Sequence, residues 1–265
     1  MRAVTTSHCQ DWREFARKIS LAPPGSIELI RERGADVRIA RVRAPDGTPV
    51  VIKLWNRPGW RGLLRRLTLG NPAGREWRGL QRLRQAGLDV PEPIAYLSRL
   101  GPAAAHTEAL ITRDLGPCDN GVDHLKALIA AGEFEAERLF NERIVTATAL
   151  MIRRGFIDID HRLPNFIVPP SGVPVRLDFE LIARRPFPRL WKKEYARMLG
   201  TLIGSFVFAV QPDVMRAKAF AGRLRETLDP PDAVLAGAEC LVHEMLAEQY
   251  RSIGLKVEID TLWRP

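Results

Sequence analysis

Three side chains in the second half of the sequence carry oxygen atoms suited to binding a metal ion or accepting a proton. Asp160 and Asn165 lie five positions apart in DHRLPN, and Pro164 between them excludes a continuous helix. Asp178 follows thirteen positions after Asn165, at the end of the apolar segment VRLDFE. Carboxylate and amide oxygens are hard ligands of the kind that Mg²⁺ prefers, and a carboxylate can also act as a general base. The pattern is short, and D-x-x-x-x-N strings and turn aspartates also arise without any such role.

Two charged residues in the first half of the sequence are candidates for the same site. Lys53 lies inside the apolar run VVIKLW, where strand alternation puts it on one face with Val51 and Trp55. An ammonium on that face needs a partner, unless the strand lies at a sheet edge and the head group reaches solvent. Glu76 is the one acidic residue between Lys53 and Gly87. In the first turn of a helix it either compensates the helix dipole or reaches Lys53 and holds its ammonium in place.

The first part of the chain has the pattern of a small antiparallel sheet. Apolar residues alternate over residues 26–55, and turn signals at 33–36 and 44–47 divide this stretch into three strands. A helix with an apolar face follows and stops at Gly87. A further strand pair then ends at residues 109–112, before a loop that begins RDLGPCDNG.

Beyond residue 120 the pattern changes to long helices, which we predict at 122–131 and 137–154. A strand-and-turn segment, FIDIDHRLPNFIVPPSGVPVRLDFE, interrupts them, and the chain is helical again after it. Strands first and helices later predict an α+β chain in two lobes. We expect a β-rich lobe over residues 1–115 and a helical lobe over residues 116–265.

The composition limits the classes of partner and compartment. The chain has 265 residues, and 40 Lys and Arg against 31 Asp and Glu give a net charge of +9. This excess favours a phosphate-bearing partner, which leaves nucleic acid, anionic lipid and nucleotide open. The three cysteines have no CxxC spacing, which argues against disulfides and zinc and indicates a reduced, cytosolic compartment. The apolar run at 198–210 is too short to span a bilayer and predicts a buried helix, and the N-terminus shows no secretory signal.

Taken together, the candidate residues resemble the protein-kinase-like phosphotransferases in type and order. A strand lysine, a helix glutamate, a loop D-x-x-x-x-N and a strand-end D-F-E follow one another as in that superfamily. The resemblance covers nearly the whole chain and implies a two-lobed protein-kinase-like fold that uses ATP and Mg²⁺. It implies that Lys53 holds the α- and β-phosphates, that Glu76 pairs with Lys53, and that Asp160 is the catalytic base. It also implies that Asn165 and Asp178 bind Mg²⁺.

The sequence departs from protein kinases in three places. No G-x-G-x-x-G is present, and the first strand turn offers only Gly34 to bring backbone N–H groups to a phosphate. Asp158 occupies the position, two before the implied base, where protein kinases carry histidine. After Asp178 the chain runs into a helix with no A-P-E and no room for a long activation loop. These differences favour a kinase of small molecules or sugars over a kinase of proteins.

More narrowly, two segments resemble the lipopolysaccharide core kinases of the Kdo/WaaP type. They are REWRGLQRLRQAGLDVPEPIAY and the basic insert LWNRPGWRGLLRRL before it. Members of that family are bacterial cytosolic enzymes that transfer the γ-phosphate of ATP to a sugar of the lipid A-linked inner core. The resemblance implies that this chain phosphorylates a sugar hydroxyl of a lipopolysaccharide inner core or a related glycolipid, in the cytoplasm or at the periphery of the inner membrane.

Two basic clusters bear on the choice of partner. Residues 53–87 hold nine Lys or Arg and one Glu, and in the insert tryptophans and leucines are interleaved with arginines, as in segments that lie on anionic lipid headgroups. A solvated basic face is the competing interpretation there. The second cluster follows Asp178 and predicts an anionic acceptor, unless it is only a solvated helix start; it comprises Arg184, Arg185, Arg189, Lys192, Lys193 and Arg197. Nucleic acid is the least favoured partner, because no stacking or groove-reading motif accompanies the charge.

Two other functions compete with this interpretation. A small-molecule kinase of the aminoglycoside or choline type would share the five site residues, but its cationic substrates call for an acidic pocket where this chain has Arg and Lys. A pseudokinase would act as a binding or scaffolding protein. The joint presence of Lys53, Asp160, Asn165 and Asp178 argues against a pseudokinase, whereas the single Gly34 keeps it open.

Overall fold

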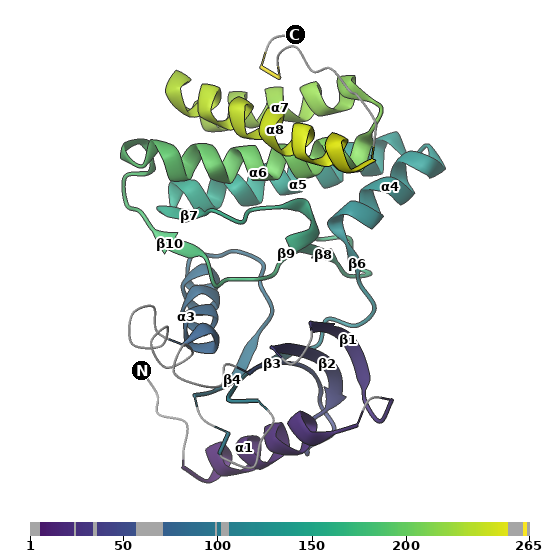
Figure 1. Cartoon of the computed structure of the whole chain (residues 1–265), viewed down its shortest axis with the longest axis vertical. Helices are drawn as coiled ribbons and strands as arrows, with labels where there is room; N and C mark the ends of the chain where they lie inside the picture. The colour runs from purple at the N-terminus through teal and green to yellow at the C-terminus, as the bar shows by residue number, and fades with distance from the viewer. Residues whose placement is uncertain are drawn as a thin grey trace. The chain divides into compact units, whose positions relative to one another are not determined.

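The alternating stretch at residues 26–55 forms three antiparallel strands in the computed structural model of the chain, as predicted (Figure 1). They are β1 (Glu28–Arg33), β2 (Val37–Arg43) and β3 (Pro49–Trp55). With β4 (Pro93–Leu97) and β5 (Glu108–Arg113) they complete a five-stranded antiparallel sheet in the order β1-β2-β3-β5-β4. Because β3 is an interior strand, the edge-strand interpretation of Lys53 is wrong.

The structure describes most of the chain and divides it into two units. The described residues are 6–23, 25–33, 36–56, 71–98, 100–101, 106–253 and 262–263. The units are Met1–Arg82 with Pro91–Leu115, and Leu83–Val90 with Gly116–Pro265. Gly34 and the basic insert at 57–70 lie outside the described residues, so the predictions made on them stay predictions.

The two faces of the five-stranded sheet bury different partners. On one face Val50, Ile52 and Leu54 belong to an apolar core that packs against Trp12 and Phe15 of α1 (Thr6–Leu21). The alternate residues of β3 point to the other face, where Trp55 and Leu110 pack with Ala73 and Trp77 of α3 (Pro72–Gln85). Lys53 lies two positions before Trp55, and side chains two positions apart in a strand point to the same face. Lys53 therefore points to the face that α3 covers.

Helix α3 places Glu76 differently from the sequence-based expectation. The helix begins at Pro72, a residue whose fixed φ suits a helix start, and it ends just before Gly87, whose φ of +84° requires glycine. Glu76 is therefore its fifth residue and lies in the second turn, not the first. Because the field of a helix dipole falls off within the first turn, dipole compensation is a poor explanation for this carboxylate.

The second unit consists mainly of five long helices. The predicted helices at 122–131 and 137–154 are α4 (Gly121–Ala131) and α5 (Phe134–Arg153). The apolar run at 198–210 is the larger part of α6 (Lys192–Val210), which is buried over most of its length, as predicted. Figure 1 shows α6 running alongside α8 (Asp232–Ile253), with α7 (Val214–Leu228) next to them. None of the described helices is both long and apolar enough to cross a membrane.

Short strands in the second unit hold the segment that contains the candidate residues. β7 (Phe156–Asp158) pairs with β10 (Ile182–Arg184), and β8 (Phe166–Val168) lies between β6 (Asp119–Asn120) and β9 (Val175–Arg176). The segment from 159 to 165 connects β7 to β8 and ends in the single helical turn Leu163–Asn165. It is thus anchored at both ends by strand pairing.

Gly121, the first residue of α4, lets that helix approach this segment closely. A Cβ atom at Gly121 would lie 2.7 Å from the carbonyl oxygen of Leu163, which is a main-chain atom and cannot simply move aside. Gly222 in α7 is the opposite case, because a Cβ there would meet nothing within 4 Å. Replacing each glycine by alanine therefore distinguishes a steric clash, expected only at Gly121, from the general preference of helices for alanine.

We expect Gly121→Ala to lower the free energy of unfolding by about 1–3 kcal/mol, as overpacking does. For a chain of this size that corresponds to a fall in melting temperature of roughly 2–4 °C per kcal/mol. Gly222→Ala should raise stability by up to about 1 kcal/mol, because alanine is the better helix former. Thermal unfolding of both variants measures this, and equal melting temperatures would contradict the close approach.

Candidate active site

Two of the candidate residues form an ion pair within the first unit. Lys53 Nζ lies 2.7 Å from Glu76 Oε2, and the two side chains are only 17% and 6% exposed. The ammonium also lies 5.0 Å from the centre of the Trp55 ring. Because this pair is shielded from water, it fixes the lysine more firmly than a surface pair would. The structure thus brings together two residues predicted to bind a nucleotide, although that role itself stays a prediction.

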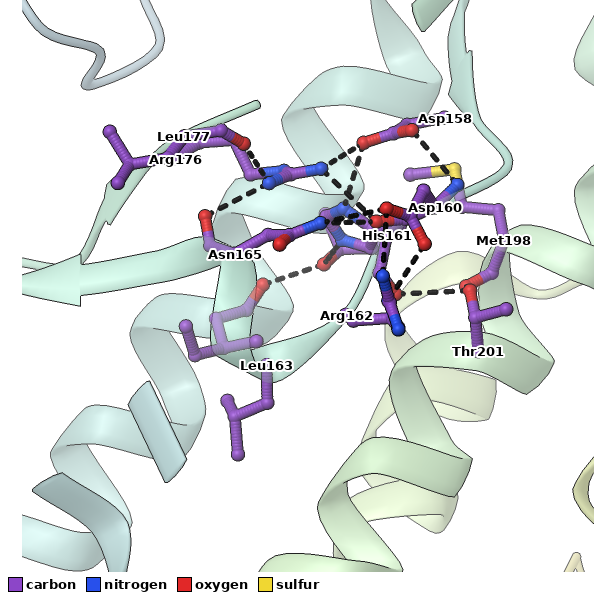
Figure 2. Close-up of polar contacts among 12 residues, drawn as sticks. Asp158, Asp160, His161, Arg162, Leu163, Asn165, Arg176, Leu177, Met198 and Thr201 are labelled. Atoms are coloured by element: carbon purple, nitrogen blue, oxygen red, sulfur yellow. Dashed lines mark hydrogen bonds and ion pairs between the residues drawn. The ribbon is translucent and has the colours of Figure 1, made fainter. Parts of the chain in front are cut away.

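In the second unit two candidate residues, Asp160 and Asn165, lie on the loop between β7 and β8 (Figure 2). Asn165 Nδ2 donates to the main-chain oxygen of Asp160 at 2.8 Å and lies 3.3 Å from Asp160 Oδ2. Arg162 Nε lies 2.7 Å from Asp160 Oδ1, and this ion pair is partly open to solvent. Since the amide nitrogen of Asn165 is used within the loop, its Oδ1 oxygen is the atom suited to coordinate a cation.

Asp178 lies just beyond β9 in an unusual backbone conformation. Its φ is +60°, in the left-handed region that aspartate tolerates better than most residues. The main-chain N–H of Leu177 donates to the main-chain oxygen of Asn165 at 2.7 Å, so the two segments run side by side. A non-glycine residue held at positive φ costs on the order of 1–3 kcal/mol and is typical of functional sites.

The donor set formed by Asn165 and Asp178 is small but fits Mg²⁺. This ion usually keeps several waters and takes one or two carboxylates together with phosphate oxygens of a substrate. Over the described ranges of the chain, no group of three His, Cys, Asp or Glu side chains is arranged to hold a metal. Any Mg²⁺ bound at these two residues would therefore need additional ligands from a nucleotide and from water.

A buried arginine ties the two segments of this part of the site together. Arg176 is 2% exposed, and its Nη2 donates to Asp158 Oδ2 and to the main-chain oxygen of Asp160, the latter at 3.3 Å. Its Nη1 donates to the main-chain oxygens of Asn165, at 2.9 Å, and of Leu177. Figure 2 shows the guanidinium at the centre of these contacts. One planar group therefore reaches the residues on both segments.

Asp158 completes this arrangement from the other side. Its Oδ1 accepts the main-chain N–H of Asp160 at 3.0 Å, while its Oδ2 faces Arg176. The carboxylate is fully buried, so its charge is tolerated only because the guanidinium and the N–H satisfy it. The aspartate that stands where protein kinases carry histidine thus has a structural partner of opposite charge.

His161 is buried in the same interior and is neutral. Thr148 of α5 donates its hydroxyl proton to the oxygen of Ile144, so His161 Nε2, 2.9 Å away, must be the donor in its contact with Thr148. Burial, with a smaller effect from the charge of Arg176, lowers the pKa of His161 well below its ordinary value of 6.5. Asp158 Oδ2 lies 4.0 Å from Nδ1 and favours the charged form, but Arg176 already neutralises that carboxylate.

Helix α6 contacts the loop through two hydroxyl groups. Thr201 Oγ1 lies 3.1 Å from the main-chain oxygen of His161, and the N–H of Leu163 donates to Ser205 Oγ at 2.8 Å. Both hydroxyls belong to an otherwise apolar, buried helix face, so they satisfy loop groups that would lack a partner in that interior.

Sequence reasoning missed this supporting set of residues. The sequence pattern singles out none of Arg176, Thr201 and Ser205, and it does not predict the contact between His161 and Thr148 of α5. The one available signal was an arginine inside the short apolar strand VRL, at a position where a charge has to find a partner. Asp158 was noted as a departure from the kinase pattern, but its partner was not predicted.

A comparison with known protein families finds a similarity over part of the chain. Residues 38–163, slightly less than half of the 265 residues, match the family described as Lipopolysaccharide kinase (Kdo/WaaP) family. The match indicates that the chain is a kinase, and the matched stretch contains Lys53, Glu76 and Asp160.

The fold of the chain is the predicted α+β kinase-like fold. The solved structure "WaaP in complex with acyl carrier protein" has a TM-score of 0.58 and 20% identity, over 92% of this chain and 99% of that chain. A second structure, "Co-crystal structure of WbdD and kinase inhibitor LY294002", has a TM-score of 0.46 and 19% identity, over 83% of this chain and 46% of that chain. The fold assignment rests on the first of these. Among curated proteins, none matches the sequence.

We expect Arg176→Met to lower the free energy of unfolding of this kinase by about 3–5 kcal/mol, because it leaves Asp158 buried without its partner. Arg138 is the matched control, since it also pairs with carboxylates, here Glu135 and Glu142, but on an exposed helix face. Arg138→Met should cost no more than about 1 kcal/mol. Chemical denaturation of both variants measures the difference. Similar losses in the two variants would contradict the account of Arg176.

The pKa of His161 also predicts how stability depends on pH. The unfolded chain binds a proton at His161 near pH 6.5, whereas the folded chain does so only at lower pH. Below about pH 6.5 the unfolded state therefore binds more protons than the folded state. As the pH falls, this group lowers the free energy of unfolding by up to about 1.4 kcal/mol for each pH unit. His161→Gln, which keeps a donor for Thr148, should reduce the slope measured between pH 5 and pH 7.

The control for this measurement is His243→Gln, at an exposed position of α8. It should leave the slope of stability against pH unchanged. If His161→Gln has the same slope as the parent chain, proton binding at this buried histidine does not govern the acid side of the stability curve.

Proposed function

We propose that this kinase uses Mg²⁺ and ATP to phosphorylate a sugar hydroxyl of a lipopolysaccharide inner core or a related glycolipid. The match of residues 38–163 to the lipopolysaccharide kinase family supports the kinase activity and its link to lipopolysaccharide. The observation that carries the proposal is the loop in which Asp160 and Asn165 contact each other beside the segment of Asp178. The proposed lobes are residues 1–115 for nucleotide binding and residues 116–265 for catalysis.

In this proposal Asp160 is the general base. Its carboxylate takes the proton of the acceptor hydroxyl while that oxygen bonds to the γ-phosphorus, and the bond to the bridging oxygen of ADP breaks. Arg162, which now pairs with Asp160 in a partly exposed contact, is weakly held there and can be displaced by the acceptor. Lys53 binds the α- and β-phosphates, and Glu76 keeps its ammonium in place.

Asn165 and Asp178 would hold Mg²⁺, which when bound neutralises phosphate charge and aligns the phosphates. Gly34 is proposed to bring backbone N–H groups to the phosphates, and it lies outside the described residues. Phosphoryl transfer gains most of its rate from positioning and charge neutralisation. The proposed residues supply both without a covalent intermediate on the protein.

The charges near the loop favour an anionic or neutral acceptor over a cationic one. Arg162 forms an ion pair with Asp160, the proposed base. The second basic cluster begins six residues after Asp178, at Arg184. An aminoglycoside or a choline-like substrate would meet repulsion from these groups. An acceptor sugar that carries carboxylate or phosphate groups would instead be attracted to them.

We expect Mg·ATP to raise the melting temperature of the chain, and Asp178→Ala to abolish this rise. Asp160→Ala should keep the rise but lower phosphotransfer by about 10²–10⁴-fold, the usual contribution of a general base. Asp11→Ala, on an exposed position of α1, is the matched control and should change neither. An ATP-consumption assay across lipopolysaccharide core fragments, aminoglycosides and protein substrates identifies the acceptor class.

The outcomes separate the alternatives. Turnover with core fragments alone supports the proposal, and turnover with aminoglycosides alone would replace it by a small-molecule kinase. Unchanged turnover in Asp160→Ala would remove Asp160 from the role of base. No rise in melting temperature at millimolar nucleotide would contradict ATP binding.

A further inference from the structure

The segment at residues 181–197, which we call the basic–apolar segment, exposes an unusual set of side chains. It runs from β10 through the helical turn Pro188–Leu190 into the start of α6. Four of its large apolar side chains are open to solvent: Leu181 (48%), Phe187 (68%), Leu190 (77%) and Trp191 (39%). Exposed apolar side chains that are clustered, rather than scattered, mark interaction surfaces.

The same segment is strongly basic. It contains six basic residues and one acidic residue, Glu194, which gives a formal net charge of +5. The basic residues are Arg184, Arg185, Arg189, Lys192, Lys193 and Arg197. All are exposed except Arg185, whose guanidinium lies 3.8 Å from the centre of the Trp191 ring. The basic–apolar segment therefore intermixes large apolar groups with positive charge over a short length of chain.

Internal contacts leave most of this positive charge available. Arg189 pairs with Asp229 at 3.0 Å, but both side chains are largely exposed, so the pair is weak and exchanges easily with other anions. The backbone, in contrast, is firmly attached. Ile182 and Ala183 pair with β7, and a Cβ at Gly155 would lie only 3.0 Å from Pro186. The side chains are therefore presented on a fixed support.

We propose that the basic–apolar segment is the contact surface for an anionic membrane leaflet. Apolar side chains such as Phe187 and Leu190 would enter the headgroup region, while Lys192 and Lys193 would lie among the lipid phosphates. The net positive charge of the segment favours an anionic lipid surface over a purely apolar partner. Phe134 shows the contrast, because it is equally exposed at 71% but lies between Glu133 and Glu135.

This surface follows Asp178 closely in the chain, and its Ile182 pairs with Asp158, at the end of β7 where the proposed catalytic loop begins. As a route to a lipid-linked acceptor the inference rests on the proposed function, whereas binding to the leaflet itself does not require phosphotransfer. The basic insert at 57–70 offers a second, competing lipid contact, and it lies outside the described residues. The test must therefore separate the two segments.

Co-sedimentation of the full chain with vesicles tests the proposal. We expect binding to vesicles of phosphatidylcholine with one third phosphatidylglycerol, and much weaker binding to phosphatidylcholine alone. Phe187→Ser with Leu190→Ser, and separately Lys192→Gln with Lys193→Gln, should each weaken binding by on the order of tenfold or more. Arg61→Gln with Arg65→Gln and Arg66→Gln in the insert should have the smaller effect.

Matched controls remove the same side-chain types elsewhere on the second unit. Phe134→Ser with Met215→Ser removes two apolar side chains that are 71% and 70% exposed, and Lys126→Gln with Arg153→Gln removes two exposed charges. Both controls should bind vesicles like the parent chain. The melting temperature without nucleotide, measured on every variant, reports whether the fold is intact.

Three outcomes would overturn the proposal. They are no binding of the parent chain to anionic vesicles, equal binding to both vesicle types, and binding that survives both changes in the basic–apolar segment. Binding that survives both changes would assign lipid contact to the basic insert. No binding of the parent chain would indicate that the basic–apolar segment contacts a protein instead of a membrane. Vesicle binding without any Mg·ATP effect would instead count against the proposed function and leave this inference standing.

Discussion

The buried ion pair between Arg176 and Asp158 is the interaction on which the candidate site depends most. A single buried charge would be costly in this interior, so each of the two groups is stable there only in the presence of the other. The planar guanidinium has more donors than Asp158 needs, and the remaining ones reach main-chain oxygens at Asp160, Asn165 and Leu177. Two segments far apart in sequence are thereby held in one arrangement.

Each of the two units holds its own candidate residues in the same physical way. In the first unit the shielded pair of Lys53 and Glu76 fixes an ammonium on the face of an interior strand. In the second unit α6 adds Thr201 and Ser205, whose hydroxyls satisfy main-chain groups of the loop. This arrangement suits a kinase, because phosphoryl transfer needs positioned charges more than it needs a reactive protein group.

Much of the fold could be predicted from the sequence, because strand alternation and turn residues are local signals. The three strands at 26–55, the buried helix at 198–210 and the helices at 122–131 and 137–154 all appear. The position of Glu76 within its helix was wrong, since Pro72 starts that helix one turn earlier than the apolar pattern indicates. Helix ends depend on single residues and are correspondingly harder to locate.

The supporting contacts of the site could not be predicted, for a different reason. Arg176, the partner of Asp158, lies 18 positions after it in the sequence. The hydroxyls of Thr201 and Ser205 lie about 40 positions after the loop residues that they contact. Hydrogen bonds of this kind follow from tertiary packing and leave no period in the sequence. The five candidate residues themselves were recognised only through the resemblance to kinases, because each is an unremarkable residue when taken alone.

Arg176 is expected to keep the loop in its arrangement before any nucleotide binds. Amide hydrogen exchange at Asp160, Leu163 and Leu177 tests this most directly, because their N–H groups bond to Asp158, Ser205 and Asn165. Without nucleotide these three amides should exchange as slowly as those in the middle of α6, and Mg·ATP should change their rates little. Fast exchange without nucleotide, with protection appearing only when Mg·ATP is added, would contradict the account.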